Sequence, residues 1–258
     1  MLRRSFPSID FIPVLRLRSA FRDHYTDGNL RQRDQVYARH VAHCLTNEIL
    51  SVARDRDLVC WALDCLCEVR PDLRSFPVHN GYLAAEHDRI GRHRACVEQK
   101  ARGRLAVGLA WSSLLLSASR RPFFSDLTDW APLFESDNIA VFSLQPNVNA
   151  AEKSYLERRG WELIVLEDID LKDDFEETGA LMCALDHVVS PPTTMVEFAG
   201  ALGVPGTLIS TTQYTRWRRR PNGFDVWHPS IFVEQAVDIE GSKALAERTA
   251  LRLRNAAC

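Results

Sequence analysis

From residue 103 onward, short apolar runs alternate with segments whose apolar residues recur at helical spacing. The runs at 105–111, 139–145, 162–166, 187–190 and 207–210 predict buried strands. Helices are predicted between them, at 127–134, 150–159, 175–185 and 194–202. Strands that alternate with helices in this way imply a parallel sheet covered on both faces. We therefore expect an α/β protein with a Rossmann-like sheet domain over residues 103–258.

The pattern over the first 102 residues is weaker and mainly helical. Apolar positions recur at helical spacing within 30–69, a charged helix is expected over 86–100, and Asp10–Pro13 suggests one short strand. A complete nucleotide-binding half would need a glycine-bearing first turn and several strands, and neither is evident. We expect residues 1–102 to form an incomplete N-terminal region before the sheet domain.

The stretch from Ser190 to Pro205 is the most informative part of the chain. Two prolines end the strand, and Thr193 or Thr194 suits the first position of a helix that ends at Gly203. Glu197 follows Thr194 at capping-box spacing. Free N–H groups at a helix start, beside two hydroxyls, suit the binding of phosphate. The alternative is an ordinary capped helix of a strand–helix–strand unit.

Composition excludes several classes of protein. A net charge of −2 gives no reason to expect nucleic-acid binding, and no apolar run approaches the length of a membrane span. The opening residues lack the apolar core of a targeting peptide, and the seven cysteines favour reduced thiols in the cytoplasm. Cys60, Cys65 and Cys67 lie close together, but without a matching second pair they predict buried thiols rather than a metal site.

Several segments between about residue 76 and residue 235 together resemble GT-B glycosyltransferases. The resemblance is to bacterial heptosyltransferase-like proteins and to O-linked N-acetylglucosamine transferases, which are often linked to tetratricopeptide repeats. Its segments are Val107–Ser112, Leu127–Leu133, Phe142–Gln145, Asp170–Phe175 and the Thr193–Thr194 loop. The resemblance implies a GT-B donor domain that moves a sugar from a nucleotide-diphosphate sugar to a glycan, lipid or protein acceptor. We expect no cofactor, and no required metal because the sequence shows no metal-binding cluster.

The same resemblance implies roles for particular residues. The hydroxyls of Thr193 and Thr194 and the start of their helix would hold the donor diphosphate. Glu197 stands where an acid binds the ribose in the N-acetylglucosamine transferases. Asp174 and Phe175 would lie beside the base or sugar, although an acidic loop at a helix start is an equally simple interpretation of that stretch.

Further donor contacts are expected near the end of the first strand, because ligands of open α/β sheets bind at the carboxyl ends of the strands. Trp111, Ser112 and Ser113 occupy that position. Arg120 could offset the charge of the leaving diphosphate, although an exposed basic residue is the alternative. The basic run 216–220 is interpreted as the rim of a pocket rather than as a nucleic-acid site.

The sequence does not identify a catalytic base. In GT-B transferases the base usually comes from the N-terminal domain, where His24, Asp27 and His79 are candidates only because they are polar. The heptosyltransferase-like relatives often carry His at the position of Glu197. Two other functions therefore remain open: a non-catalytic module that binds a sugar nucleotide, and an epimerase of the GT-B type.

Overall fold

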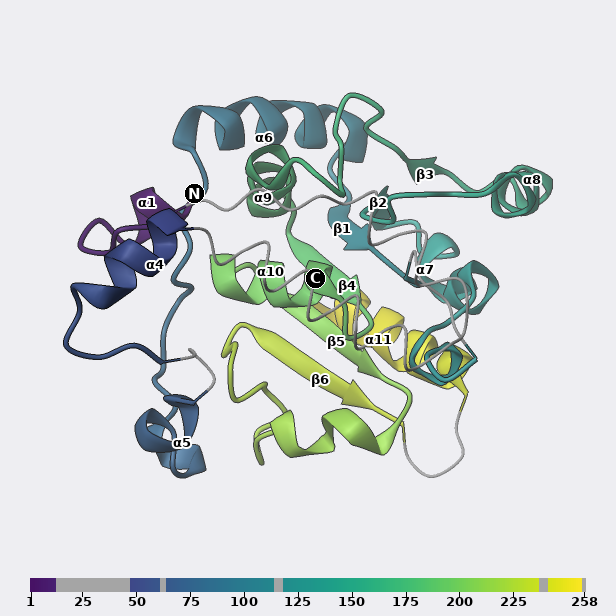
Figure 1. Cartoon of the computed structure of the whole chain (residues 1–258). Coiled ribbons are helices and arrows are strands. Elements are labelled where there is room, and N and C mark those ends of the chain that lie inside the picture. The colour runs from purple at the N-terminus through teal and green to yellow at the C-terminus, as the bar shows by residue number, and fades with distance from the viewer. Residues whose placement is uncertain (13–46, 61–63, 114–117, 237–240, 257–258) are drawn as a thin grey trace. The chain divides into compact units, whose positions relative to one another are not determined.

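The computed structural model describes residues 1–12, 47–60, 64–113, 118–236 and 241–256. They divide into two compact units, one of residues 6–75 and one of residues 76–258 together with residues 1–5. The larger unit contains helix α6 (His87–Ala101) and the whole sheet (Figure 1). The predicted boundary between residues 102 and 103 falls in the turn between α6 and the first strand.

The larger unit is built on one sheet of six parallel strands, in the order β3-β2-β1-β4-β5-β6 (Figure 1). The strands are β1 (Leu105–Leu109), β2 (Ile139–Ser143), β3 (Leu163–Ile164), β4 (His187–Ser190), β5 (Gly206–Ser210) and β6 (Ile231–Gln235). This is the doubly wound Rossmann-like order: successive strands are added on one side of β1 up to β3, and from β4 onward on its other side. The predicted fold class is confirmed, and β6 is a sixth strand that the sequence did not reveal.

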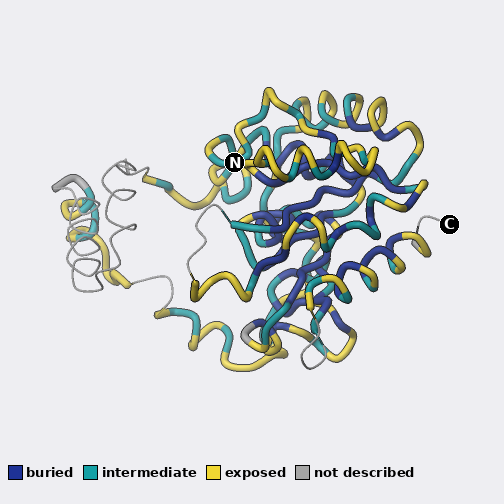
Figure 2. The backbone as a smooth tube through the Cα atoms, turned by 90° about the vertical axis from the view of Figure 1, so that its right-hand side faces the viewer, coloured by how far each residue is buried: buried dark blue, intermediate teal, exposed yellow. Residues whose placement is uncertain are grey.

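Helices cover both faces of the sheet. One buried cluster includes residues of α6, α9 (Phe175–Ala184) and α10 (Thr194–Leu202). The opposite cluster includes residues of the 3₁₀ helix η3 (Leu127–Trp130), α7 (Ala131–Phe134), α8 (Ala150–Arg159) and α11 (Ser242–Ala256). In Figure 2 the strands form the dark-blue interior of this unit, between helices whose outer turns are exposed.

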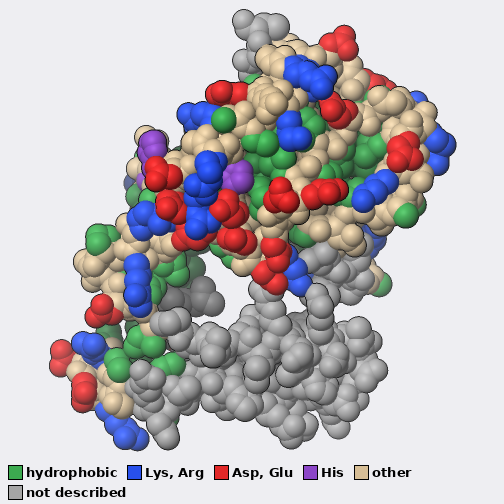
Figure 3. Space-filling model, turned by 90° about the horizontal axis from the view of Figure 1, so that it is seen from above, with side chains coloured by type: hydrophobic (Ala, Val, Ile, Leu, Met, Phe, Trp, Pro, Cys, Tyr) green, Lys and Arg blue, Asp and Glu red, His purple; other side chains and the backbone are tan. Residues whose placement is uncertain are grey.

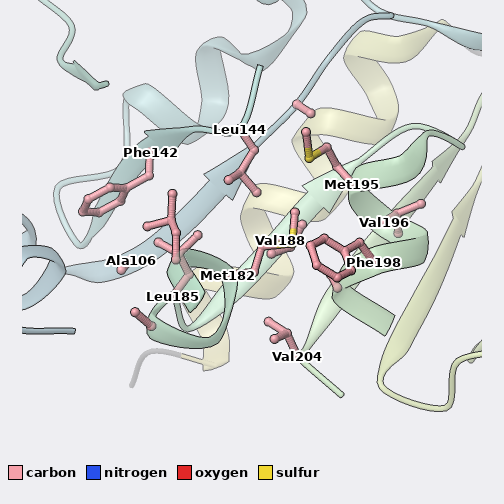
Figure 4. Packing of buried hydrophobic residues seen from close by; sticks show 14 of the residues in the cluster. Ala106, Phe142, Leu144, Met182, Leu185, Val188, Met195, Val196, Phe198 and Val204 are labelled. Carbon is pink, nitrogen blue, oxygen red and sulfur yellow. The ribbon is translucent and has the colours of Figure 1, made fainter. Parts of the chain in front are cut away.

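The two faces follow from the alternation of side chains along each strand. In β1, Ala106 belongs to the cluster beneath α6, whereas Val107 and Leu109 belong to the opposite one. Gly108 lies between them, and a Cβ there would come 2.6 Å from Leu144, so the close packing of Leu144 over β1 requires glycine. Figure 4 shows Leu144 among the apolar side chains of the cluster beneath α6.

Helix ends in the larger unit carry capping residues, and the predicted end of α10 at Gly203 is among them. Asn149 and Glu152 form a capping box at the start of α8, and Gly160 ends that helix in the left-handed conformation, with φ of 65°. Gly203 ends α10 in the same way, with φ of 76°. Local sequence therefore sets where these elements stop.

The smaller unit is helical where it is described. It contains α4 (Asn47–Arg54), α5 (Leu66–Val69) and the 3₁₀ helix η1 (Leu73–Ser75), while α1 (Leu2–Ser5) belongs to the larger unit. The predicted strand at Asp10–Pro13 is wrong for residues 10–12, which form no strand; Pro13 and most of the predicted helical stretch before residue 47 lie outside the described residues. A three-residue run needs a neighbouring strand to pair with, and no described strand precedes β1.

The prediction of buried thiols is also wrong. Cys60 and Cys67 are exposed and Cys65 is partly exposed. Cys67 lies in α5, a single turn that buries none of its residues. Cys60 and Cys65 are free thiols whose Sγ atoms lie 3.3 Å apart. Among the described residues, no helix has the length and apolarity needed to cross a bilayer.

Candidate functional site

The candidate site lies where β1 and β4 end side by side. Leu109 of β1 pairs with Val189 of β4, so the loops that follow the two strands leave the sheet at the same edge. This is the point at which the strand order reverses, where open α/β sheets bind ligands. The sequence predicted this meeting of the two loops.

Helix α10 begins beside β4 because Thr193 caps it. Thr193 has an extended backbone, with φ of −125°, and its hydroxyl oxygen accepts a hydrogen bond from the backbone N–H of Met195 at 3.3 Å. Ser190 and Thr193 hydroxyls lie 2.9 Å apart. The predicted capping box is not formed: with Thr193 as the cap, the third helical residue is Val196, and Glu197 lies one position too far along to reach the cap.

A cavity of about 190 Å³, here called the α10 pocket, opens at this helix start. Its lining includes the predicted residues Ser112, Ser113, Phe175, Thr193 and Thr194. The structure thus brings residues of three separate loops to one place. The hydroxyl of Thr194, which is exposed, has no hydrogen-bond partner among the described residues. Lys172 adds a cation to the lining.

Trp111 and Arg120 do not line the α10 pocket. Trp111 is buried on the opposite face of the sheet and donates from Nε1 to Glu152 at 2.7 Å. Arg120 is exposed, with its guanidinium 5.6 Å from the ring of Phe124. These contacts make Trp111 part of the support of the loop and leave Arg120 at the surface.

Gln145, which the sequence analysis did not select for a role, holds the loop after β1. Its Oε1 accepts hydrogen bonds from the backbone N–H groups of Trp111, at 3.3 Å, and Ser112, at 3.1 Å. The side chain is buried at the end of β2. It fixes the backbone that presents Ser112 to the pocket. Its place directly after the second strand was the available signal.

Asp174 caps α9 rather than lining the pocket. Its Oδ1 accepts hydrogen bonds from the backbone N–H groups of Glu176, at 3.1 Å, and Glu177, at 3.0 Å. The interpretation of this acidic stretch as a helix start therefore accounts for Asp174. Its neighbour Phe175 lies on the pocket lining, with its ring edge-on to that of Phe198 at 5.4 Å.

Glu197 lies in a separate network of charges, and not on the pocket lining. Both of its oxygens accept hydrogen bonds from Arg218, and Oε2 lies 3.1 Å from Nε2 of His228. Arg218 also donates from Nε to the buried Asp225 at 2.8 Å. Burial alone would raise the pKa of Glu197, but the hydrogen bonds and positive charges of His228 and Arg218 outweigh it and lower the pKa to about 2.

In the sequence Arg218 is recognisable only as part of a basic run, and nothing there indicates Asp225 or His228 as partners of Glu197 and Arg218. Asp225 holds the turn that follows, because its Oδ1 accepts from the backbone N–H groups of Trp227 and His228. Of the proposed bases, His24 and Asp27 lie outside the described residues. Nε2 of His79 lies 3.0 Å from the backbone oxygen of Trp227.

Comparison with known proteins identifies a partial relative. The chain is 32% identical over 174 residues to "Protein FlbA" of Caulobacter vibrioides. The match covers 66% of this chain and 29% of FlbA, so the chain spans less than a third of that protein. The name of the relative states no activity. No protein-family model matches the chain.

Proposed function

We propose that the sheet domain binds a nucleotide-diphosphate sugar at the α10 pocket and that the protein transfers the sugar to an acceptor. The supporting observation is that Ser112, Ser113, Thr193 and Thr194 meet at the start of α10. Free main-chain N–H groups at a helix start favour phosphate oxygens, and hydroxyls donate to the same atoms. The resemblance to GT-B transferases concerns the same loops.

The electrostatics of the pocket suit a diphosphate leaving group. The positive end of the α10 dipole and the ammonium of Lys172 both lie at the cavity, and each stabilises charge that builds up as the sugar departs. The exposed ring of Phe175 offers an apolar surface to a base. A volume of about 190 Å³ is below that of a typical pocket for a whole ligand, so we assign the cavity to the diphosphate part of the donor.

We infer that Thr194, rather than Glu197, makes the decisive side-chain contact with the donor. Glu197 already bonds to Arg218 and His228, whereas the hydroxyl of Thr194 is exposed. A ribose contact by Glu197, as predicted from the sequence, would add to those bonds.

A cytoplasmic site of action fits the five described cysteines, which are all free thiols.

The test is the affinity of the full chain for nucleoside diphosphates and their sugars, measured by calorimetry after a thermal-shift screen. We expect Thr194→Val to weaken diphosphate binding about tenfold or more, since a hydrogen bond to a charged group contributes about 1.5–3 kcal/mol. Its melting temperature should stay close to that of the parent, because the residue is exposed. Thr128→Val, an exposed threonine on η3 outside the pocket, is the matched control.

Glu197→Gln separates the two roles considered for that residue. As a member of the Arg218 network it should melt earlier and bind nucleotide like the parent. Weakened binding without a loss of stability would instead support the ribose contact. If no diphosphate binds, or if Thr194→Val binds like the parent, the proposed donor site is wrong. Binding without sugar transfer to any acceptor would favour the non-catalytic module.

A further inference from the structure

A second cavity, of about 470 Å³, lies at the carboxyl end of β5 and along β6, the last strand of the sheet. We call it the β6 cavity. Its lining includes Arg216, Arg219, Phe232 and Arg248. It shares no lining residue with the α10 pocket.

Positive charge dominates this cavity. Three arginines line it, and Glu234 is the one acid among its described lining residues. Glu234 is already engaged: its Oε1 accepts from Arg248 at 2.9 Å, and its Oε2 accepts from Arg252, also at 2.9 Å. Within the described parts of the chain, Arg216 and Arg219 pair with no carboxylate. Two guanidinium groups therefore remain available at the cavity.

Arg219 is partly held in place before any ligand arrives. Arg219 donates from Nε to the backbone oxygen of Val233 at 3.3 Å, which leaves its two terminal nitrogens as donors. Its guanidinium also lies 6.0 Å from the centre of the Phe232 ring. Less side-chain freedom is lost on binding when a guanidinium is already held.

Two groups near the cavity have lowered pKa values, and burial is the first cause of both. Burial lowers the pKa of Arg252, and although Glu234 opposes this, repulsion from Arg248 adds to it. Burial, followed by repulsion from Arg252, lowers the pKa of His187 to about 4.

From this geometry we propose that the β6 cavity binds the phosphate group of a small molecule, with Arg216 and Arg219 as its counter-ions. Guanidinium groups bind phosphate oxygens in a bidentate manner. A phosphate ester carries a charge of about −1.5 to −2 at neutral pH, which two unpaired arginines match better than they match a single carboxylate. The cavity volume is in the range of small-ligand sites. The proposal does not rest on the function assigned to the α10 pocket.

The test is calorimetric titration of the full chain with inorganic pyrophosphate and inorganic phosphate, and with acetate as the carboxylate comparison, all at one ionic strength. We expect pyrophosphate to bind more tightly than acetate. The double variant Arg216→Gln/Arg219→Gln should weaken pyrophosphate binding about tenfold or more. Arg158→Gln, which removes an exposed arginine of α8 outside both cavities, should bind like the parent. Each single variant is measured too, and circular dichroism verifies that all are folded.

Thr194→Val separates this proposal from the proposed donor site. A pyrophosphate affinity that falls only in the arginine variants supports the β6 cavity, whatever the nucleotide experiments show. An affinity that falls only in Thr194→Val assigns the anion to the α10 pocket and overturns the proposal. Absence of pyrophosphate binding, equal binding of acetate, or an unchanged affinity in the arginine variants would also overturn it.

Discussion

Close contacts decide which side chain some positions of the larger unit can hold, and Gly200 is an example. It lies within α10, where a methyl group would come 2.5 Å from Cβ of His228. His228 in turn lies against Glu197. Gly91 is also a helical glycine, in α6, but a methyl group there would have no neighbour within 4 Å. The two glycines therefore differ in what surrounds them and not in their backbone.

We predict opposite effects for alanine at these two positions. Gly91→Ala should stabilise the protein by about 0.5–1 kcal/mol, since alanine favours a helix over glycine. Gly200→Ala should destabilise it by about 1–3 kcal/mol, because overpacking of His228 outweighs the gain in helix propensity. Urea midpoints for both variants test this. A Gly200→Ala variant as stable as Gly91→Ala would show that His228 moves aside freely.

The residues of the α10 pocket were predictable to the extent that they act through local sequence. Ser112 follows directly after one predicted strand and Thr193 lies two prolines beyond another, and ligands of open parallel sheets bind where such strands end side by side. The network of Glu197 was not predictable. Its partners Arg218 and His228 come from an irregular segment 21 and 31 residues away, where no periodic pattern indicates which side chains point inward.

Two helices on one face of the sheet are joined by charged side chains as well as by apolar contacts. Glu177 of α9 accepts hydrogen bonds from Arg89 and lies 2.6 Å from Nε2 of His93, both on α6. A hydrogen bond from His93 lowers the pKa of Glu177, and although burial opposes this, the charge of Arg89 adds to it. Figure 3 shows acidic, basic and histidine side chains gathered on this face.

We predict that Glu177→Gln loosens the contact between α6 and α9. Glutamine retains the shape of the Glu177 side chain but lacks its charge, so the free energy of unfolding should fall by about 1–2 kcal/mol. The effect should shrink in high salt, which screens partly exposed charges. Glu157→Gln, on the exposed side of α8, is the control. Equal urea midpoints for the two variants would assign the contact between the helices to apolar packing alone.

Elements were predictable where strands and helices alternate in a regular way. From β1 to β5 the order of the elements along the chain and their approximate limits were predicted, because each strand is an apolar run bounded by turn residues. β6 and α11 were missed. β6 follows a long irregular segment that includes η4 (Gln213–Arg218), and its burial is interrupted by partly exposed residues. α11 has no acidic residue in its first turn to mark its start.

At the scale of the whole molecule, acid should weaken the fold through His187. The ring lies 2.9 Å from the hydroxyl of Thr207, and its pKa of about 4 is below the ordinary value of 6.5 because of burial and the charge of Arg252. In the unfolded chain His187 therefore takes up a proton near pH 6.5, whereas in the folded protein it does so only near pH 4. Stability is present at neutral pH and is lost as the pH falls through this range.

Urea unfolding between pH 7 and pH 5 measures this loss, in a range above the titration of most carboxylates. We expect the free energy of unfolding of the parent to decrease by about 2 kcal/mol as a result of His187. His187→Gln keeps a polar partner for Thr207 and should remove most of that decrease. A variant with the same pH dependence as the parent would show that the folded protein accepts the proton.

The order of the strands also has a consequence for how the protein is made. β1 pairs with β2 soon after both are synthesised, but its other neighbour, β4, follows much later: Val107 of β1 pairs with His187 of β4, 80 positions further along the chain. Pairings of such high contact order form slowly, because the chain must close a long loop first. Until β4 arrives, β1 offers a bare apolar edge of the kind that chaperones protect. The α10 pocket lies where β1 and β4 end side by side, so it forms only when the two halves of the sheet join.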